Sequence, residues 1–217
     1  MKKIRFLILT SLFSLFVSCP VLSADNYKLD KHYQELSAEV LKSPLVRINA
    51  ENDKILVIEF FSYACPACYA VSDQVRKWSQ NLPKDVEFQR VPVEFHTGWD
   101  MYARAYYAAE FLQVLDKIDA NMFASAHNRA ADLLTDDNMR KFFEQNAGVS
   151  AEDFNKTFRS FAVDRALERA KMLMRDYYIF SVPSVVVGNK YATDLAKVGA
   201  IDNFVPVIEH LIEKRRN

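Results

Sequence analysis

The sequence predicts an α/β fold with an inserted all-helical domain, and three observations carry that prediction. A strand pattern passes directly into a helix pattern within residues 55–79. Helix patterns alone then fill residues 97–177, and strand patterns return from residue 183 onward. The 217 residues are 50% hydrophobic and 26% charged, which is an ordinary globular composition with room for one domain that carries an insertion.

The central strand is predicted at residues 55–61, where the sequence is a nearly continuous run of β-branched, aliphatic and aromatic residues. Such a run is typical of a strand that is buried on both faces. After it the hydrophobic period changes to that of a helix, with Pro66 suited to the first helical position. The predicted helix has apolar positions at Val71, Val75 and Trp78 and ends before Pro83.

Cys65 and Cys68 form a Cys-x-x-Cys pair at the start of this helix. The free backbone N–H groups and the helix dipole favour a thiolate at Cys65, which is therefore the candidate nucleophile. Cys68 lies on the same helical face, close enough to form a disulfide, and is the candidate resolving thiol. A redox pair at a junction of strand and helix is favoured over half of a zinc site or two inert core cysteines.

The zinc alternative is weak because the chain offers too few ligands for a structural site. The only other cysteine is Cys19, and the four histidines show no ligand spacing. We therefore expect no metal and no bound cofactor beyond the Cys65–Cys68 disulfide itself.

Residues 1–24 resemble a secretory signal peptide. Three basic residues precede an apolar run at residues 6–17, and a small-residue segment that ends at Ser23-Ala24 follows. We expect cleavage after Ser23 or Ala24 and export of the mature protein. The alternative is processing at Cys19, which stands in a lipobox-like segment and would then carry a lipid anchor.

The charge balance gives no general electrostatic case for nucleic-acid binding. Residues 1–24 contain three basic and no acidic residues, so the remaining chain has 28 acidic and 25 basic residues and a formal charge of −3. With the signal removed, Cys65 and Cys68 are the only thiols. In an oxidising compartment, that usage indicates a catalytic disulfide and a fold that is stable without a disulfide framework.

Elements on both sides of the central strand complete the sheet. Residues 25–43 form an N-terminal lead-in with apolar residues at roughly helical spacing, packed on the domain or serving as a dimerisation arm. We expect a first edge strand at residues 44–48 and a third strand at residues 86–93, where Pro92 indicates an edge or a strand end. The sheet resumes with strands at residues 183–187 and 190–192, and a helix at residues 201–214 ends the chain.

The segment at residues 97–177 has the apolar spacing of helices throughout. Gly148 is a predicted helix stop, and Ser150 with Asp153 forms a predicted capping box. The domain boundaries that follow are 44–96 with 178–217 for the α/β domain and 97–177 for the insertion. The helices predicted within the insertion span residues 99–118, 122–134, 138–147 and 150–177.

Over nearly all of residues 25–217, the chain resembles the DsbA family of periplasmic thiol:disulfide interchange proteins, within the thioredoxin-like superfamily. The matching features are Glu59-Phe60-Phe61-Ser62 before Cys65-Pro66-Ala67-Cys68-Tyr69, the helical insertion, and Val182-Pro183 before the penultimate strand. The resemblance implies exchange through a mixed disulfide on Cys65, resolution by Cys68 and a cis Pro183. It also implies unfolded exported proteins as substrates and a quinone-linked membrane oxidase resembling DsbB as the reoxidising partner.

Ala67 departs from the best-known members of this family, which have histidine between the cysteines. Histidine can stabilise the neighbouring thiolate by charge or hydrogen bonding, and alanine cannot. A depressed cysteine pKa and an oxidising disulfide are known properties of the family. From the resemblance we therefore expect a disulfide that still oxidises its substrates, but less strongly than in the members with histidine.

Glu59 is a lone carboxylate in an otherwise apolar strand, which is costly unless the group is paired or used. We predict a buried proton acceptor for Cys68. The resemblance implies a basic residue nearby, and an ungapped placement of the third strand puts Arg90 at that position, where it could pair with Glu59. The alternative is a strand-end glutamate that reaches solvent.

The substrate is expected to bind beside the disulfide. A cis bond at Pro183 would bring the Val182 backbone next to the cysteines, where an extended peptide could pair with it. Pro66 and Ala67 complete the predicted substrate contacts, and Tyr63 and Tyr69 are candidates for an apolar binding face. The competing functions are a disulfide isomerase or reductase of the same compartment and a peptide-binding, chaperone-like module.

Overall fold

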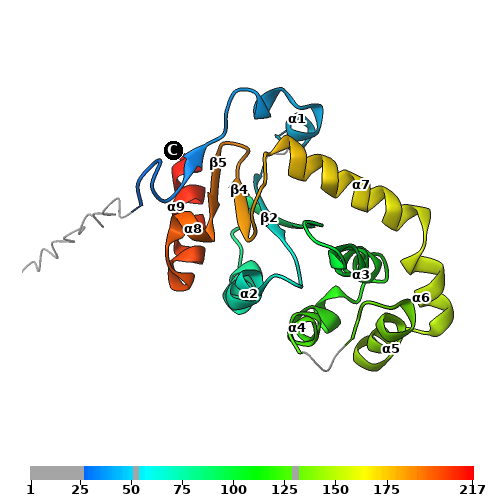
Figure 1. Cartoon of the computed structure of the whole chain (residues 1–217). Coiled ribbons are helices and arrows are strands. Elements are labelled where there is room, and N and C mark those ends of the chain that lie inside the picture. The colour runs from blue at the N-terminus through cyan, green and yellow to red at the C-terminus, as the bar shows by residue number, and fades with distance from the viewer. Residues whose placement is uncertain (1–26, 51–53, 129–131) are drawn as a thin grey trace, which may run out of the picture.

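The computed structural model describes residues 27–50, 54–128 and 132–217 (Figure 1). The predicted signal segment and Cys19 lie outside these residues. Among the described helices, none is long and apolar enough to cross a membrane.

A five-stranded sheet forms the centre of the α/β part. Its order is β1-β5-β4-β2-β3, so β2 is an interior strand and β3 is an edge strand, as Pro92 predicted. Strand β2 pairs in parallel with β3 and antiparallel with β4, while β5 pairs antiparallel with β4 and with β1. The strands are β1 (Gln34–Glu35), β2 (Ile55–Phe61), β3 (Val86–Pro92), β4 (Ser184–Val187) and β5 (Tyr191–Asp194).

Alternate residues of β2 and β4 enter two separate hydrophobic clusters, because successive side chains point to opposite faces of a sheet. Val57 and Val187 pack in a cluster with residues of helices α2 (Pro66–Ser79) and α9 (Phe204–Arg216). Ile58 and Phe60 belong to the other cluster, where the Phe60 ring lies 5.8 Å from that of Tyr177. The continuous apolar pattern of β2 thus reflects burial on both faces.

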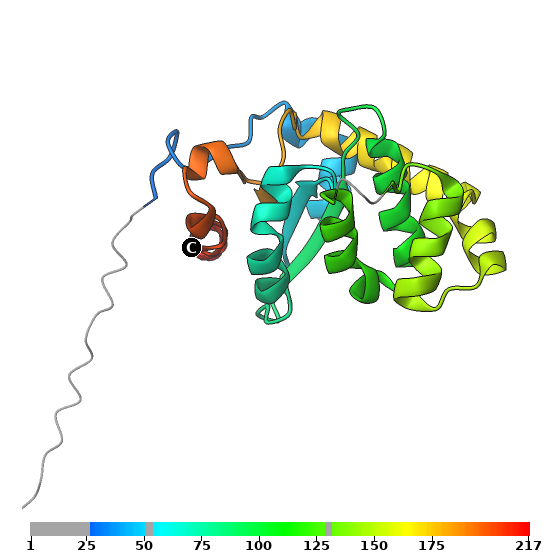
Figure 2. The same cartoon turned by 60° about the horizontal axis from the view of Figure 1, so that its bottom comes forward.

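The inserted helices lie to one side of the sheet, between β3 and β4 in the chain (Figures 1 and 2). Helix α3 is their centre and packs against α4, α6, α7 and β3. Its small and aromatic residues allow close contact, and most of them are buried. These helices are α3 (Trp99–Phe111), α4 (Leu115–Ala126), α5 (Asp136–Ala147), α6 (Ala151–Phe158) and α7 (Phe161–Asp176).

Two predicted helix signals in the insertion are confirmed. Gly148 ends α5 in the left-handed conformation with φ of 69°, a conformation that glycine adopts without a Cβ clash. The Ser150 hydroxyl accepts a hydrogen bond from the Asp153 backbone N–H at 3.0 Å and donates one to the Asp153 carboxylate at 2.7 Å, so it caps α6.

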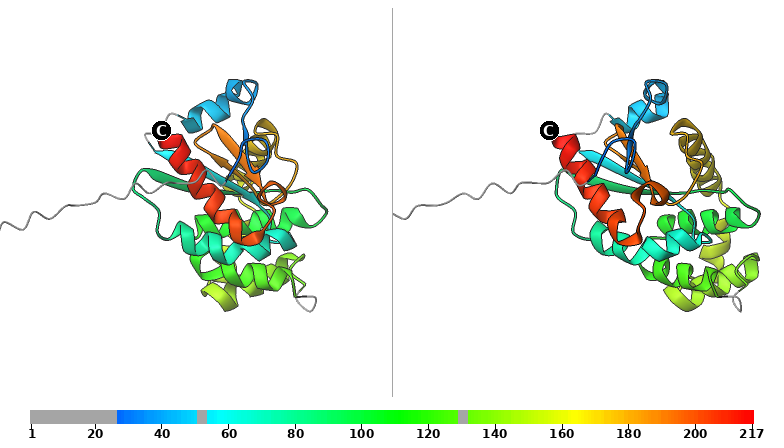
Figure 3. Two further views of the ribbon diagram at one scale, coloured as in Figure 1. Left: turned by 90° about the vertical axis from the view of Figure 1, so that its left-hand side faces the viewer. Right: turned by 60° about the vertical axis from the view of Figure 1, so that its left-hand side comes forward.

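The C-terminal helix α9 packs across α2, β4 and β5 (Figure 3). The preceding elements are α8 (Leu195–Val198) and the 3₁₀ turn Ile201–Asn203, so the predicted helix begins three residues later than expected. At its end, Arg216 donates hydrogen bonds to both carboxylate oxygens of Asp85, at 2.8 and 2.9 Å.

The prediction of a strand at residues 44–48 is wrong, because α1 (Pro44–Ala50) occupies this segment and packs against α7. The Ser43 hydroxyl accepts a hydrogen bond from the Val46 backbone N–H at 3.4 Å, and Pro44 is the first helical residue. Serine before an N-terminal proline is a helix-start signal that outweighed the β-branched composition.

The edge strand opposite β3 comes from the lead-in at residues 25–43, whose apolar residues have roughly helical spacing. Strand β1 lies beside β5, and the Tyr33 ring packs 5.7 Å from the Tyr191 ring. The lead-in therefore packs on the sheet, and apart from β1 it contributes one 3₁₀ turn, Val40–Lys42.

Two predicted helices of the insertion are interrupted. The helix predicted at 150–177 breaks at Ser160, whose hydroxyl accepts a hydrogen bond from the Val163 backbone N–H at 3.3 Å and so starts α7. The helix predicted at 99–118 breaks at Gln113, which has φ of 57°. The helix predicted at 122–134 is the last part of α4, which begins at Leu115 and ends at Ala126, and residues 129–131 of that prediction lie outside the described residues. The α/β class with inserted helices is confirmed.

Candidate active site

Cys65 is the N-cap residue of α2, directly after the central strand and its connecting loop. Its sulfur accepts a hydrogen bond from the Cys68 backbone N–H at 3.4 Å. Pro66 is the first helical residue and has no N–H, so it leaves no donor unsatisfied. The predicted placement of the outer thiol at a helix N-terminus is confirmed.

The two thiols have opposite pKa shifts, although only two residues separate them. The pKa of Cys65 is lowered to about 6, first by a hydrogen bond from the Cys68 thiol and then by the backbone N–H groups of Cys68 and Ala67, against the effect of burial. The pKa of Cys68 is raised far above its ordinary value, chiefly because its fully buried side chain is removed from solvent. The two cysteines are not joined in a disulfide in this structure.

The loop before β4 lies against Cys65. The Val182–Pro183 peptide bond is cis, as the resemblance implied, and the Val182 carbonyl oxygen accepts a hydrogen bond from the Cys65 thiol at 3.5 Å. Earlier in the same segment, Tyr178 and Phe180 are 54% and 83% exposed. These two aromatic residues were missed because a connecting segment has no hydrophobic period.

Glu59 is buried in β2 opposite Arg90 of β3, with 1% of its side chain exposed. The Arg90 Nε donates a hydrogen bond to the Glu59 carboxylate at 2.7 Å. The predicted pair is confirmed, and the alternative of a glutamate in solvent is wrong. Burial raises the pKa of Glu59, while the charge and hydrogen bond of Arg90 act in the opposite direction.

Asp119 of α4 is a second carboxylate on the same guanidinium. The Arg90 Nη1 lies 2.7 Å from an Asp119 oxygen, and the Tyr63 hydroxyl donates to that oxygen at 2.7 Å. The sequence analysis missed Asp119, although a signal existed. Asp119 precedes the buried Met122 and Phe123 by three and four residues, so it is an acid on an apolar helix face.

The structure separates the two tyrosines proposed for an apolar binding face. Tyr63 is buried beneath the active-site loop, so its assignment to that face is wrong. Tyr69 is 43% exposed, and its ring stacks on that of His127 with centroids 4.8 Å apart.

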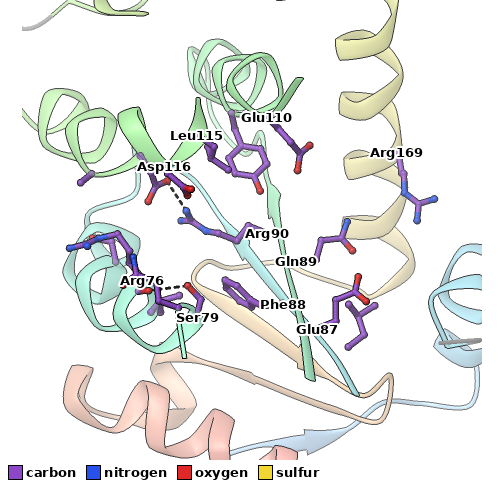
Figure 4. A pocket seen from close by; sticks show the side chains of 17 residues that line it. Arg76, Ser79, Glu87, Phe88, Gln89, Arg90, Glu110, Leu115, Asp116 and Arg169 are labelled. Atoms are coloured by element: carbon purple, nitrogen blue, oxygen red, sulfur yellow. Dashed lines mark hydrogen bonds and ion pairs between the residues drawn. The ribbon is translucent and has the colours of Figure 1, made fainter. Parts of the chain in front are cut away.

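A cavity of about 790 Å³ lies between α2, β3 and the inserted helices, away from the two thiols. Figure 4 shows Arg90 extending from β3 into this cavity, with Glu110 and Arg169 on its far wall. Arg90 and Asp119 are part of the lining, and Glu59 is not. Within residues 27–50, 54–128 and 132–217, no group of three His, Cys, Asp or Glu side chains could hold a metal ion.

Comparisons with known proteins agree on one family. A family model described as a DSBA-like thioredoxin domain matches residues 99–205, a stretch that begins after the two cysteines, so this match does not depend on the Cys-x-x-Cys motif. The chain is 34% identical over 208 residues to the thiol:disulfide interchange protein DsbA of Azotobacter vinelandii, with 96% of this chain and 94% of that protein covered.

Solved structures give the same answer. The crystal structure of Pseudomonas aeruginosa DsbA aligns with a TM-score of 0.78 at 34% identity, covering 89% of this chain and 96% of that one. DsbA from Xylella fastidiosa aligns with a TM-score of 0.73 at 26% identity, covering 85% and 95%. The fold is thus thioredoxin-like with an inserted helical domain, and the chain belongs to the DsbA family of thiol:disulfide oxidoreductases.

Proposed function

We propose that this oxidoreductase donates its Cys65–Cys68 disulfide to unfolded exported proteins. The observation that carries the proposal is the opposite shift of the two thiol pKa values. A site that stabilises the Cys65 thiolate favours the reduced protein over the disulfide. A disulfide whose reduced form is stabilised is readily given to a substrate.

The reaction begins when a substrate thiolate attacks the Cys65 sulfur, because Cys68 is fully buried and Cys65 lies at the loop. The Cys65–Cys68 bond breaks as a bond forms between substrate and Cys65, and Cys68 leaves and takes up a proton. A second substrate thiolate then attacks the substrate sulfur of this mixed disulfide. Cys65 leaves as a thiolate, the substrate is oxidised to a disulfide, and the protein is reduced to a dithiol.

Glu59 exchanges the proton of Cys68 in this scheme. Its charge contributes to the raised pKa of Cys68, so the two groups are electrostatically coupled. A protonated Glu59 can supply the proton that the leaving Cys68 takes, and the carboxylate can accept it when Cys68 attacks the Cys65 mixed disulfide during reoxidation.

The substrate backbone pairs with Val182 beside Pro183, and Pro66 and Ala67 contact it from the helix N-terminus. The Val182 carbonyl lies 3.5 Å from the Cys65 sulfur, which places it where a peptide joined to that sulfur would run. Backbone pairing requires no particular substrate sequence, which suits a catalyst that acts on many unfolded chains.

We also propose where the protein works, what reoxidises it and where its domains begin and end. The protein works in the periplasm of a Gram-negative bacterium after removal of residues 1–24, with acylation at Cys19 as the alternative. A DsbB-like, quinone-linked membrane oxidase reoxidises it, and it has no cofactor besides its own disulfide. Its α/β domain spans 44–96 and 178–217, and its helical domain spans 97–177.

The reduction potential of the Cys65–Cys68 pair, measured at equilibrium with reduced and oxidised glutathione, tests the proposed direction. A donor has a potential above that of the glutathione pool. A value near that of a reducing thioredoxin would instead indicate a reductase or isomerase. A Cys65→Ala variant that retained full biological activity would indicate a chaperone-like module in which the disulfide is incidental.

A further inference from the structure

Asp119 joins the helical insertion to the floor of the active site. It stands on α4, and one of its oxygens accepts hydrogen bonds from both Arg90 on β3 and Tyr63 in the loop that leads to Cys65. Arg90 in turn holds Glu59 through its Nε. The cluster of Glu59, Tyr63, Arg90 and Asp119 therefore connects β2, β3, α4 and the active-site loop.

The charges in this cluster are unequal, because one guanidinium faces two carboxylates. A single cation cannot fully compensate two buried anions, so one of the carboxylates favours its protonated form. Glu59 is the more buried of the two, with 1% of its side chain exposed against 12% for Asp119. The proton is therefore placed on the carboxyl group that is coupled to Cys68.

The ionisable groups around Glu59 come from four elements. Arg90 faces it from β3, Asp119 from α4, Cys68 from α2 and Tyr106 from α3. Its β4 neighbour in the sheet is Val185, which does not titrate. Arg90 is the only cation of this set, and Asp119 is the group that competes for it.

We propose that Asp119 is a positioning residue for thiol–disulfide exchange. Because Asp119 shares the Arg90 guanidinium with Glu59, the charge of Glu59 is only partly compensated, and Glu59 keeps a proton that it can exchange with Cys68. This rests on the proposed function, since it assigns a role in the Cys68 step of that reaction. Without the charge of Asp119, Arg90 would serve Glu59 alone and hold it as a carboxylate. Asp119 acts through Arg90 and touches neither sulfur.

The test is the pH dependence of Cys68 attack in an Asp119→Asn variant, which keeps the size of the side chain and its oxygen acceptor. The mixed disulfide between Cys65 and glutathione is trapped at low pH and then jumped to each test pH, and glutathione release is timed by rapid mixing. We expect the acidic limb of the rate profile to move down by about one pH unit. Release on that limb becomes about tenfold faster, while the high-pH plateau falls because Glu59 is a weaker base.

Three companion variants separate this role from a structural one. Asp119→Glu keeps the charge and should retain the wild-type profile. Asp116→Asn removes a carboxylate from the same helix and the same cavity lining, and should leave the profile unchanged. In a Glu59→Gln background, Asp119→Asn should no longer move the profile. Far-UV circular dichroism and thermal unfolding establish that each variant is folded.

An unchanged profile in folded Asp119→Asn, or an equal shift in the Glu59→Gln background, overturns the proposal. A wild-type protein that does not exchange thiols overturns the proposed function instead. In that event, or if Asp119→Asn does not fold, the Glu59 carboxyl is titrated by ¹³C nuclear magnetic resonance in wild type and in Asp119→Glu. These titrations then decide the inference. Equal midpoints above the ordinary value of a glutamate support it, and a midpoint at that ordinary value overturns it.

Discussion

The two ends of the active site stabilise charge by different means. At the outer end, the Cys65 sulfur accepts hydrogen bonds from the Cys68 thiol and from backbone N–H groups of the α2 N-terminus. At the inner end, Glu59, Arg90 and Asp119 meet through side chains alone. The outer charge thus depends on one side chain and on backbone groups that substitutions leave in place, whereas the inner charges depend on three replaceable groups.

The largest expected effect is at the outer end, where Cys65→Ala should abolish exchange because Cys68, the other thiol of the described residues, is fully buried and cannot replace the nucleophile. Cys68→Ala should instead accumulate mixed disulfides on Cys65, since the attack that releases the partner is lost. Mass spectrometry of each variant after mixing with a reduced, unfolded substrate and oxidised glutathione checks both outcomes. Equal exchange by wild type and Cys65→Ala would show that Cys65 is not the nucleophile.

Arg90→Met tests the inner end. It leaves Glu59 and Asp119 without their cation, and breaking a buried ion pair in this way costs about 3–5 kcal/mol of unfolding free energy. The matched control is Arg159→Met, which removes an exposed pair with Asp136 and should cost less than about 1 kcal/mol. Urea unfolding of the oxidised proteins gives both values, and equal losses would contradict the inner cluster as described.

The pH dependence of stability isolates the outer charge. The Cys65 pKa of the folded dithiol is depressed from 9.0 to about 6, so its contribution is fully present above the unfolded pKa and is lost as pH falls through about 6. The melting temperature of the reduced protein should therefore rise relative to that of the oxidised protein between pH 5 and 8. Cys65→Ala cannot form the disulfide, and its melting temperature should lack the extra rise that the reduced wild type shows between pH 5 and 8. A flat difference between reduced and oxidised wild type would contradict the lowered pKa.

The smallest expected effect comes from adding a side chain to the outer end. Ala67→His supplies a hydrogen-bond donor or a charge beside Cys65 and should make the disulfide more oxidising by about 30 mV, which corresponds to about 1.4 kcal/mol. Equilibration with glutathione measures the change. An unchanged or more reducing potential would contradict the expected stabilisation of the Cys65 thiolate by histidine.

Local signals predicted the outer end well. The strand at 55–61, the helix start at Cys65 and Pro66 and the caps at Gly148 and Ser150 each depend on residues a few positions apart. The same kind of signal, Ser43 before Pro44, starts α1, and it outweighs the β-branched composition that predicted a strand at 44–48. Strand β1 has only two residues, too short to show a period.

The inner end was predicted only in part, because it is made by contacts between distant segments. The pairing of Glu59 with Arg90 followed from the resemblance and an ungapped placement of the third strand, and the register of β2 and β3 confirms it. Nothing in a linear pattern brings Asp119 to that pair, since the packing of α4 against α2 places it there. Burial of Tyr63 follows from the same packing, so its position was mistaken as well.

The contact between Cys65 and Val182 joins positions 117 residues apart in the chain. Between them lie the whole helical insertion and the edge strand β3. During synthesis from the N-terminus, the two cysteines therefore precede by a long interval the loop against which the outer one rests. The loop can pack on Cys65 only when most of the chain is present, so the complete site forms only after the helical insertion has been synthesised.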